Sequence, residues 1–462
     1  MKRHRLAHAT LAGFFMAGLL AAEPVVEIEE DVYSFTPANN GAGPMWCSGS
    51  TTLVRDGPLV FATGLETLTN TPPLNNCRWV LWRRDDAGWT KVYTDNGRTR
   101  EPSPLARLNG GWVLVSANPT LTPVGQAGGG PARPEVVFFA AASPTQAVQT
   151  IAPQWAGVPR FTEHSYRSFV ADAATGEIAL FQNIDYTHAE WALGRWDAGR
   201  LEWRGAGQLQ WPWGADYARP QPIRICYPNV ALARGQLHFV GVSDILEPNP
   251  EWRAFKKQLT GQEWDYEFRR LFYVWSKDLA TGRFEPWLEL ASREQTCGWI
   301  TPGDLHVAPD GVVHIVWTER AIDERLREKF FPAAKQRHEL NYARLRDGKV
   351  ISRRTLLAAE EGGAREVPGL ARFHVSPEGR LFVFHYLSGT SAEGRPVAEN
   401  RLVELRADGT PGEAWRVPLK QPFTSFFTAT PRAGSAPSHY LDLLGHRAGV
   451  GQTISYARVA LR

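Results

Sequence analysis

The chain has 462 residues, ample for a large core, and its 51 Lys and Arg against 48 Asp and Glu leave a net charge of +3. Because this small charge is spread along the chain, it gives no reason to expect a nucleic-acid partner, whose binders concentrate Lys and Arg on one face. After the N-terminal region, the sequence lacks a run of about eighteen uninterrupted apolar residues, which excludes a conventional membrane-spanning helix.

The N-terminus has the three parts of a secretory signal peptide. A basic head at residues 2–5 precedes a mostly apolar run at residues 6–20, and Ala22 stands before an acidic, Pro-marked segment. The apolar run is too short and too rich in Gly and Ala for a membrane span. We therefore predict that residues 1–22 are a signal peptide and that the mature chain is secreted or periplasmic.

One unit recurs along the mature chain: an apolar strand, a tight turn containing Gly, and a second apolar strand. Such hairpin turns need positive φ, which Gly adopts at no steric cost. The turn glycines run from Gly57 to Gly434, so six intervals span 377 residues, a mean of about 63. The seven units are residues 53–63, 105–117, 169–183, 230–244, 305–319, 373–387 and 427–445.

A second pair of strand-like segments follows most of these hairpins. Examples are residues 78–93, 191–205, 271–290, 340–357 and 401–417. Two hairpins make a four-stranded antiparallel sheet, and seven such sheets predict an all-β fold, a seven-bladed β-propeller that closes radially. Two all-β domains side by side are the structural alternative, but they would not share one even period.

The domain boundaries follow from this fold. Residues 23–462 are predicted to form a single propeller domain, closed where residues 25–35 pair with residues 454–461. Two long insertions, residues 246–270 and 320–338, carry helical patterns and are expected as cleft walls on one face.

Four cysteines, Cys47, Cys77, Cys226 and Cys297, follow the predicted signal peptide. An even count in an oxidising compartment permits disulfides, and the pairs 47–77 and 226–297 are the first to test. Buried thiols are the alternative. None of the four forms a CxxC pair, which argues against a structural zinc site.

Propeller geometry predicts where a ligand would bind. Residues just before the first strand of a blade, and just after its second, should surround the upper mouth of the central channel. These positions are rich in His, Arg, Tyr and acids, as a polar pocket would be. They are Trp46, Cys47, Arg100, Glu101, His164, Arg167, Asp185, Tyr186, His188, Arg224, Tyr227, Asn229, Asp244, Asp304, His306, Glu319, Arg320, His385 and Tyr386.

The sharpest constellation joins two neighbouring blades. His164 and His188 flank the two strands of one hairpin, and the entry of the next blade places Arg224 and Tyr227 beside them. Several second hairpins also echo the Asp-box turn, as in Ser276-Lys-Asp278. On these residues the chain resembles the BNR-repeat, sialidase-like seven-bladed propellers that include ulvan lyases and rhamnosyl-glucuronate lyases.

This resemblance implies a secreted polysaccharide lyase that cleaves acidic oligo- or polysaccharides at a uronic acid by β-elimination. Arg224 would bind the carboxylate, His188 or Tyr227 would take the C5 proton, and His164 would act as acid or orient the substrate. Further substrate contacts are expected from the upper mouth and the first insertion. They are Arg100, Arg167, Tyr186, Asn229, Trp252, Arg269, Asp304 and Tyr386.

Other functions stay open at this point. A sialidase-like hydrolase needs three Arg, a Tyr–Glu pair and an acid, but its Arg-Ile-Pro motif is missing from the first blade. A two-carboxylate hydrolase could use Asp244 and Glu319. A non-catalytic glycan-binding propeller is the third alternative. We predict no cofactor, although His164, His188 and Asp185 could hold a cation.

Overall fold

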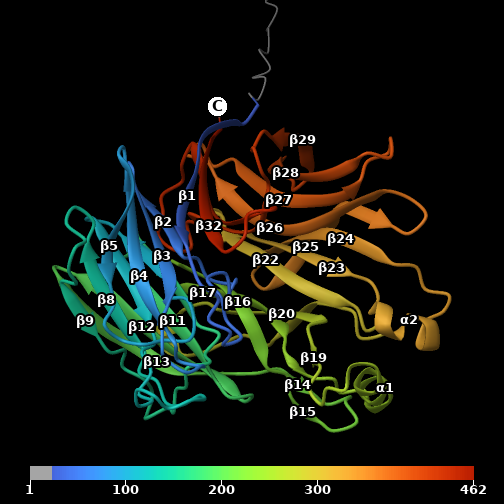
Figure 1. Cartoon of the computed structure of the whole chain (residues 1–462), viewed down its shortest axis with the longest axis horizontal. Coiled ribbons are helices and arrows are strands. Elements are labelled where there is room, and N and C mark those ends of the chain that lie inside the picture. The colour runs from blue at the N-terminus through green and yellow to red at the C-terminus, as the bar shows by residue number, and fades with distance from the viewer. Residues whose placement is uncertain (1–22, 462) are drawn as a thin grey trace, which may run out of the picture.

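The computed structural model describes residues 23–461, and the predicted signal peptide lies outside them. Seven four-stranded antiparallel sheets stand around a central axis, as Figure 1 shows. The predicted seven-bladed β-propeller is therefore confirmed. All seven predicted turn glycines have positive φ, between 59° and 85°.

The first six blades take their strands in chain order from the axis outwards. The first blade contains β2 (Leu53–Asp56), β3 (Leu59–Thr67), β4 (Cys77–Asp85) and β5 (Gly88–Thr94). The second contains β6 (Leu105–Leu108), β7 (Trp112–Ala117), β8 (Glu135–Ala140) and β9 (Gln149–Ile151). The third contains β10 (Ser168–Asp172), β11 (Glu177–Ile184), β12 (His188–Asp197) and β13 (Arg200–Gln210).

The next three blades repeat this order, with additions in the fourth. The fourth contains β16 (Ile225–Ala233), β17 (Gln236–Ser243), β20 (Arg270–Ser276) and β21 (Leu288–Ser292). The fifth contains β22 (Trp299–Val307), β23 (Val313–Arg320), β24 (Arg337–Arg346) and β25 (Lys349–Glu360). The sixth contains β26 (Arg365–Val375), β27 (Leu381–Thr390), β28 (Pro396–Leu405) and β29 (Pro411–Val417).

The seventh blade closes the ring with strands from both ends of the chain. It contains β30 (Phe423–Thr428), β31 (Tyr440–Arg447), β32 (Thr453–Ala460) and, outermost, β1 (Val25–Ser34). Strand β1 pairs antiparallel with β32, from Val25 opposite Ala460 to Ser34 opposite Thr453. Figure 1 shows the two strands side by side. This is the closure that the sequence predicted, and it protects the edge of β32.

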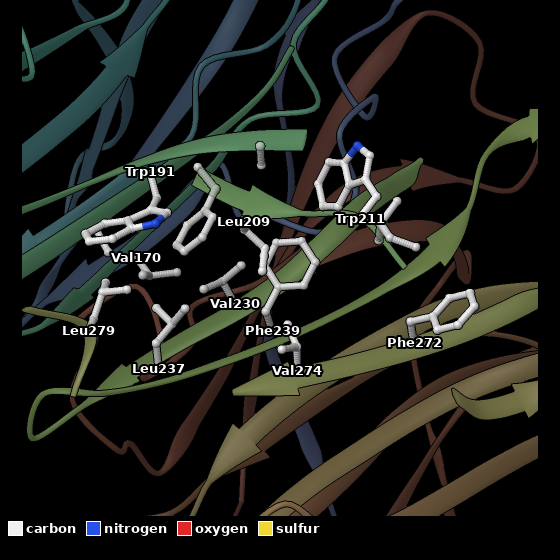
Figure 2. Close-up of a cluster of buried hydrophobic side chains, with 14 of the residues drawn as sticks. Val170, Trp191, Leu209, Trp211, Val230, Leu237, Phe239, Phe272, Val274 and Leu279 are labelled. Carbon is white, nitrogen blue, oxygen red and sulfur yellow. The ribbon is translucent and has the colours of Figure 1, made fainter. Parts of the chain in front are cut away.

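Apolar side chains fill the spaces between neighbouring blades. Between the third and fourth blades, Trp191 and Val170 face Val230 and Phe239, and all four are at most 1% exposed. Figure 2 shows this cluster, in which the side chains of both sheets interdigitate. Burial of about 25 cal/mol per Å² of apolar surface makes such contacts the main stabilising term of the ring.

The connections between successive blades lie on one face of the molecule, here called the upper face. The turns inside the first hairpins lie on the opposite, lower face. Small two-stranded sheets join β14 (Trp213–Gly214) to β15 (Gln221–Pro222) and β18 (Ile245–Leu246) to β19 (Tyr266–Glu267). The short helix η1 (Leu279–Thr281) ends the turn after β20.

The two insertions predicted from sequence contain the helices α1 (Pro250–Thr260) and α2 (Glu324–Phe330). The Asn249 side chain caps α1, and Gly261 ends it in the left-handed conformation. The helices lie side by side at one edge of the molecule (Figure 1), where Trp252 packs on Phe331 with centroids 5.5 Å apart. None of the described helices is long and apolar enough to cross a membrane.

All four cysteines are buried free thiols, so the predicted pairs 47–77 and 226–297 are wrong. Each thiol occupies its own setting: Cys77 lies 3.6 Å from the Asn40 amide and Cys297 lies 3.3 Å from the Arg269 guanidinium. The alternative of buried thiols is therefore the one that the structure bears out.

Candidate functional site

A loop from residue 35 to residue 52 crosses the upper face from the outer strand β1 to the inner strand β2. Its Trp46 stacks on Tyr166 of the third blade, with ring centroids 4.7 Å apart and planes 24° apart. At Gly49 a Cβ atom would lie 2.4 Å from the Pro228 carbonyl oxygen. The loop can approach the fourth blade this closely because that position is glycine.

Beside Trp46 lies a pocket of about 430 Å³, here called the aromatic pocket. Tyr227, Phe268 and Trp299 form its walls with Trp46, and Phe268 packs on Trp299 with centroids 4.6 Å apart. Trp299 is 38% exposed. The remaining residues that line the aromatic pocket are Phe35, Gly43, Pro44, Met45, Ser48, Val242, Ile300, Thr301, Pro302 and His446. Exposed aromatic faces of this kind can stack against the apolar faces of sugar rings.

Tyr227 reaches the pocket because β16 contains a bulge. The register with β17 shifts between Cys226 and Asn229, and Tyr227 has a φ of +48°. Bulges re-aim a side chain out of the regular alternation. Burial raises the pKa of Tyr227, so its hydroxyl stays protonated near neutral pH. The residue can therefore donate a proton or a hydrogen bond, but it is a poor base.

His164 lies next to Trp46, with ring centroids 5.1 Å apart. Its Nδ1 atom lies 3.1 Å from Oε1 of Glu101, and its side chain is 33% exposed. Glu101 is fully buried and also accepts hydrogen bonds from the backbone N–H and hydroxyl of Ser165. Burial raises the pKa of Glu101, but the partners His164, Arg167 and Ser165 outweigh it, so the pKa is lowered. The anionic Glu101 thus orients the imidazole.

Arg224 and Asp244 form a buried ion pair next to this histidine. Nη2 of Arg224 lies 2.6 Å from Oδ2 of Asp244, and its Nε donates to the Asp244 carbonyl at 3.1 Å. The guanidinium lies 3.9 Å from the centre of the Tyr186 ring. Burial raises the pKa of Asp244 in spite of Arg224. Arg224 is therefore largely neutralised and covered, which weakens its predicted role as the carboxylate anchor.

Tyr186 and Tyr266 cover the Arg224–Asp244 pair. Their hydroxyl oxygens are 2.5 Å apart, and Tyr186 is 42% exposed. Tyr266 belongs to the first insertion, so this contact ties the insertion to the third blade.

His188 does not share the partners of His164. Its Nε2 lies 3.0 Å from Oε1 of Glu190, and its Nδ1 lies 2.7 Å from the Thr187 hydroxyl. The residue opens β12, the third strand of its blade, and pairs in register with Gln210 on β13. The structure thus places the two histidines in separate hydrogen-bond networks, although the sequence suggested one common spot.

Two of the predicted substrate contacts, Asn229 and Asp304, are instead buried and bonded to arginines from other blades. Asp304 binds Nε of Arg432 at 2.9 Å and is 1% exposed. Asn229 accepts from Arg432 at 3.1 Å and from Arg372 at 3.4 Å. Arg167 is also buried, with Nη2 2.6 Å from the Pro102 carbonyl. These groups hold the blades together at the axis.

The other predicted contacts have structural partners as well. Arg100 bonds to the Asn40 carbonyl at 2.9 Å and to Glu163 at 3.4 Å. Arg269 is 1% exposed and pairs with Glu247 at 2.8 Å. Trp252 packs on Phe331 at the end of the second insertion helix, and Tyr386 packs against the apolar cluster between the sixth and seventh blades.

His306 lies at the other end of its strand from the predicted position. It lines a cavity of about 760 Å³ on the lower face, together with His314. The sequence placed the start of this strand at residue 305, whereas β22 begins at Trp299, so His306 comes near its lower end. The predicted cation ligands His164, His188 and Asp185 do not come together either. Residues 23–461 contain no group of three or more His, Cys, Asp or Glu side chains that could hold a metal ion.

Three aromatic residues of the site were not predicted from the sequence: Phe268 and Trp299, which form walls of the pocket, and Tyr166, on which Trp46 stacks. Tyr166 has a φ of +43°, and Phe268 ends the first insertion. Only the position of Trp299, six residues before the predicted repeat at 305–319, was a usable indication.

No protein-family model matches this chain, and neither does any curated protein. Solved structures resemble it at low identity. A protein of unknown function from Dyadobacter fermentans is 10% identical, with a TM-score of 0.44 over 97% of this chain and 100% of that chain. The α-L-arabinanase of Penicillium chrysogenum is 12% identical, with a TM-score of 0.39 over 95% and 98%. The GH93 α-L-arabinofuranosidase of Fusarium graminearum is 12% identical, with a TM-score of 0.41 over 94% and 97%. These likenesses concern the fold alone.

Proposed function

We propose that this chain is an exported glycan-cleaving enzyme that acts at the aromatic pocket, and that it cleaves at a uronic acid by β-elimination. The observation that carries the proposal is the oriented, partly exposed His164–Glu101 pair directly beside the platform residue Trp46. An imidazole held by a buried carboxylate has the arrangement of a general base.

The reaction needs a base and a proton donor. A base removes the C5 proton of the uronate, the electron pair left behind forms the C4–C5 double bond, and the C4–O bond breaks as the leaving oxygen takes a proton. We assign proton removal to His164, whose imidazolium the Glu101 carboxylate would stabilise. The protonated hydroxyl of Tyr227 would donate a proton to the leaving oxygen. This is the reverse of the base role that the resemblance implied for Tyr227.

A glycoside hydrolase is the second candidate, and Asp244 favours it. Burial raises the pKa of this carboxyl group, as in glycosidases whose acid protonates the leaving group. His164 lies close enough to Asp244 to influence its pKa.

The test is a panel of uronate-containing and neutral polysaccharides, followed at 235 nm and by release of reducing ends. A lyase raises both signals on uronates, because each cleavage leaves an unsaturated uronate. Release of reducing ends without a rise in absorbance at 235 nm would contradict the lyase and indicate the hydrolase. Binding without either signal would contradict catalysis and leave a glycan-binding propeller.

A further inference from the structure

A second cavity of about 340 Å³ adjoins the aromatic pocket, and the two share Trp299 and Thr301. Arg320 and His338 line it from the fifth blade, and Pro368 of β26 closes it from the sixth blade. The remaining lining residues are Thr318 and Glu319. A ligand in the aromatic pocket could therefore continue across Trp299 into this cavity.

The register of the fifth blade explains why these side chains meet. Trp299 pairs with Arg320, and Arg320 pairs with His338, so the three stand in one row across β22, β23 and β24. Directly opposite residues of an antiparallel pair project from the same face of the sheet. Two residues further along, Thr301 pairs with Thr318 on that same face. The row thus combines an aromatic ring, a cation, an imidazole and two hydroxyls.

Arg320 differs from Arg293 and Arg224 because it has no carboxylate partner among residues 23–461. Arg293 pairs with Glu319 and Glu339, and Arg224 pairs with Asp244. In the described chain, by contrast, the buried Nε of Arg320 has no hydrogen-bond partner, and no carboxylate lies within ion-pair distance of its guanidinium. Glu319 is nearby in sequence but already accepts from Arg293, Arg353 and Trp317.

We propose that this cavity is a subsite for an acidic sugar unit, in which Arg320 binds the carboxylate and Trp299 stacks on the ring. The guanidinium lies 5.9 Å from the centre of the Trp299 ring, and both side chains line the cavity. A fork of N–H donors matches a carboxylate in two parallel hydrogen bonds. His338 and the two threonines would bind hydroxyl groups of the same unit. This subsite rests on the proposed glycan function, and it would make that function specific for acidic sugars.

The test compares each uronate disaccharide of a panel with its carboxyl-reduced, neutral counterpart by calorimetric titration at low salt. The panel contains digalacturonate, dimannuronate and a glucuronate-containing disaccharide. Wild type should bind the acid form about 10- to 100-fold more tightly for at least one member, the range expected for hydrogen bonds to a charged group. Arg320→Gln should abolish this preference, and Arg320→Lys should keep part of it.

The matched control is Arg346→Gln, because Arg346 ends a strand of the same blade on the lower face, paired with Asp310. It should leave the preference unchanged. Wild type without a preference for any acid form, or Arg320→Gln with the preference intact, overturns the subsite. Turnover decides the function separately: glycan cleavage without charge preference would refute the subsite alone, and charge preference without cleavage would refute the enzyme alone.

Discussion

The carboxylate of Glu101 fixes the orientation of the His164 imidazole. Its Oε1 lies 3.1 Å from Nδ1 of His164, and the backbone N–H and hydroxyl of Ser165 donate hydrogen bonds to the same carboxylate. Nε2 would then be the atom that takes the proton in the proposed reaction. Because the pKa of Glu101 is lowered, the carboxylate remains charged at any pH at which His164 can act as a base.

Glu101→Gln tests this relation. The amide has the same shape but no charge, so it cannot stabilise the imidazolium formed during proton removal. We expect kcat to fall about 100-fold or more with little change in KM, as when the carboxylate of an oriented His is lost. Steady-state rates on the best glycan of the panel check this, with Tm measured alongside. A folded variant whose kcat stays within threefold of wild type would contradict the assignment.

At the scale of elements, strand boundaries decided which site residues the sequence could predict. Hairpin turns were predictable because their glycines need positive φ, and the polar character of the upper face followed from the strand order. The irregular parts were not. The bulge that turns Tyr227 outward and the early start of β22 at Trp299 leave no sequence pattern, so His306 was placed at the wrong end. Arg224 looked free because its partner, Asp244, lies twenty residues away.

The first insertion is anchored by a buried charge cluster. Arg269 binds Glu247 at 2.8 and 2.9 Å and Glu294 at 3.1 Å, and Lys256 of α1 binds Glu247 at 2.8 Å. These partners hold the pKa of Glu247 at about 2 in spite of its burial. Glu267 also belongs to this cluster, with its Oε2 3.6 Å from Nε of Arg269 and 3.1 Å from the Ser243 hydroxyl. Its Oε1 lacks a partner in the described chain, and burial raises its pKa to about 8.

A pH-dependent stability follows from Glu267. Its carboxyl stays protonated in the folded state up to about pH 8, whereas in the unfolded chain it ionises above about pH 4.3. The folded state therefore holds one extra proton in this window, and its stability falls as pH rises from about 5 to 8. Glu267→Gln removes this loss. We expect its Tm, relative to wild type, to rise by roughly 2–5 °C between pH 5 and pH 8.

Calorimetric scans at several pH values check this, with Glu289→Gln as the control. Glu289 pairs with Arg270 on the neighbouring strand and is 32% exposed. The control should show no such pH trend. A Tm difference for Glu267→Gln that is flat with pH would mean that Glu267 is ionised in the folded protein.

At the scale of the whole molecule, the even period of about 63 residues was enough to predict the ring. Its closure was equally predictable, because β1 and β32 are the apolar segments left at the two ends. The sequence could not show which face holds the ligand chemistry, since both faces carry polar side chains. The structure separates them: the upper face joins His164–Glu101 to an aromatic pocket, while the lower face has its own pair, His439 and Glu378, 3.5 Å apart.

This pair supplies the most direct test of the central claim, that glycan cleavage takes place on the upper face with His164 as the base. The initial rate at 235 nm is measured for wild type, His164→Ala and His439→Ala on the best uronate polysaccharide. We expect a loss of about 100-fold or more for His164→Ala and an unchanged rate for His439→Ala. A folded His164→Ala protein that cleaves at the wild-type rate would contradict it.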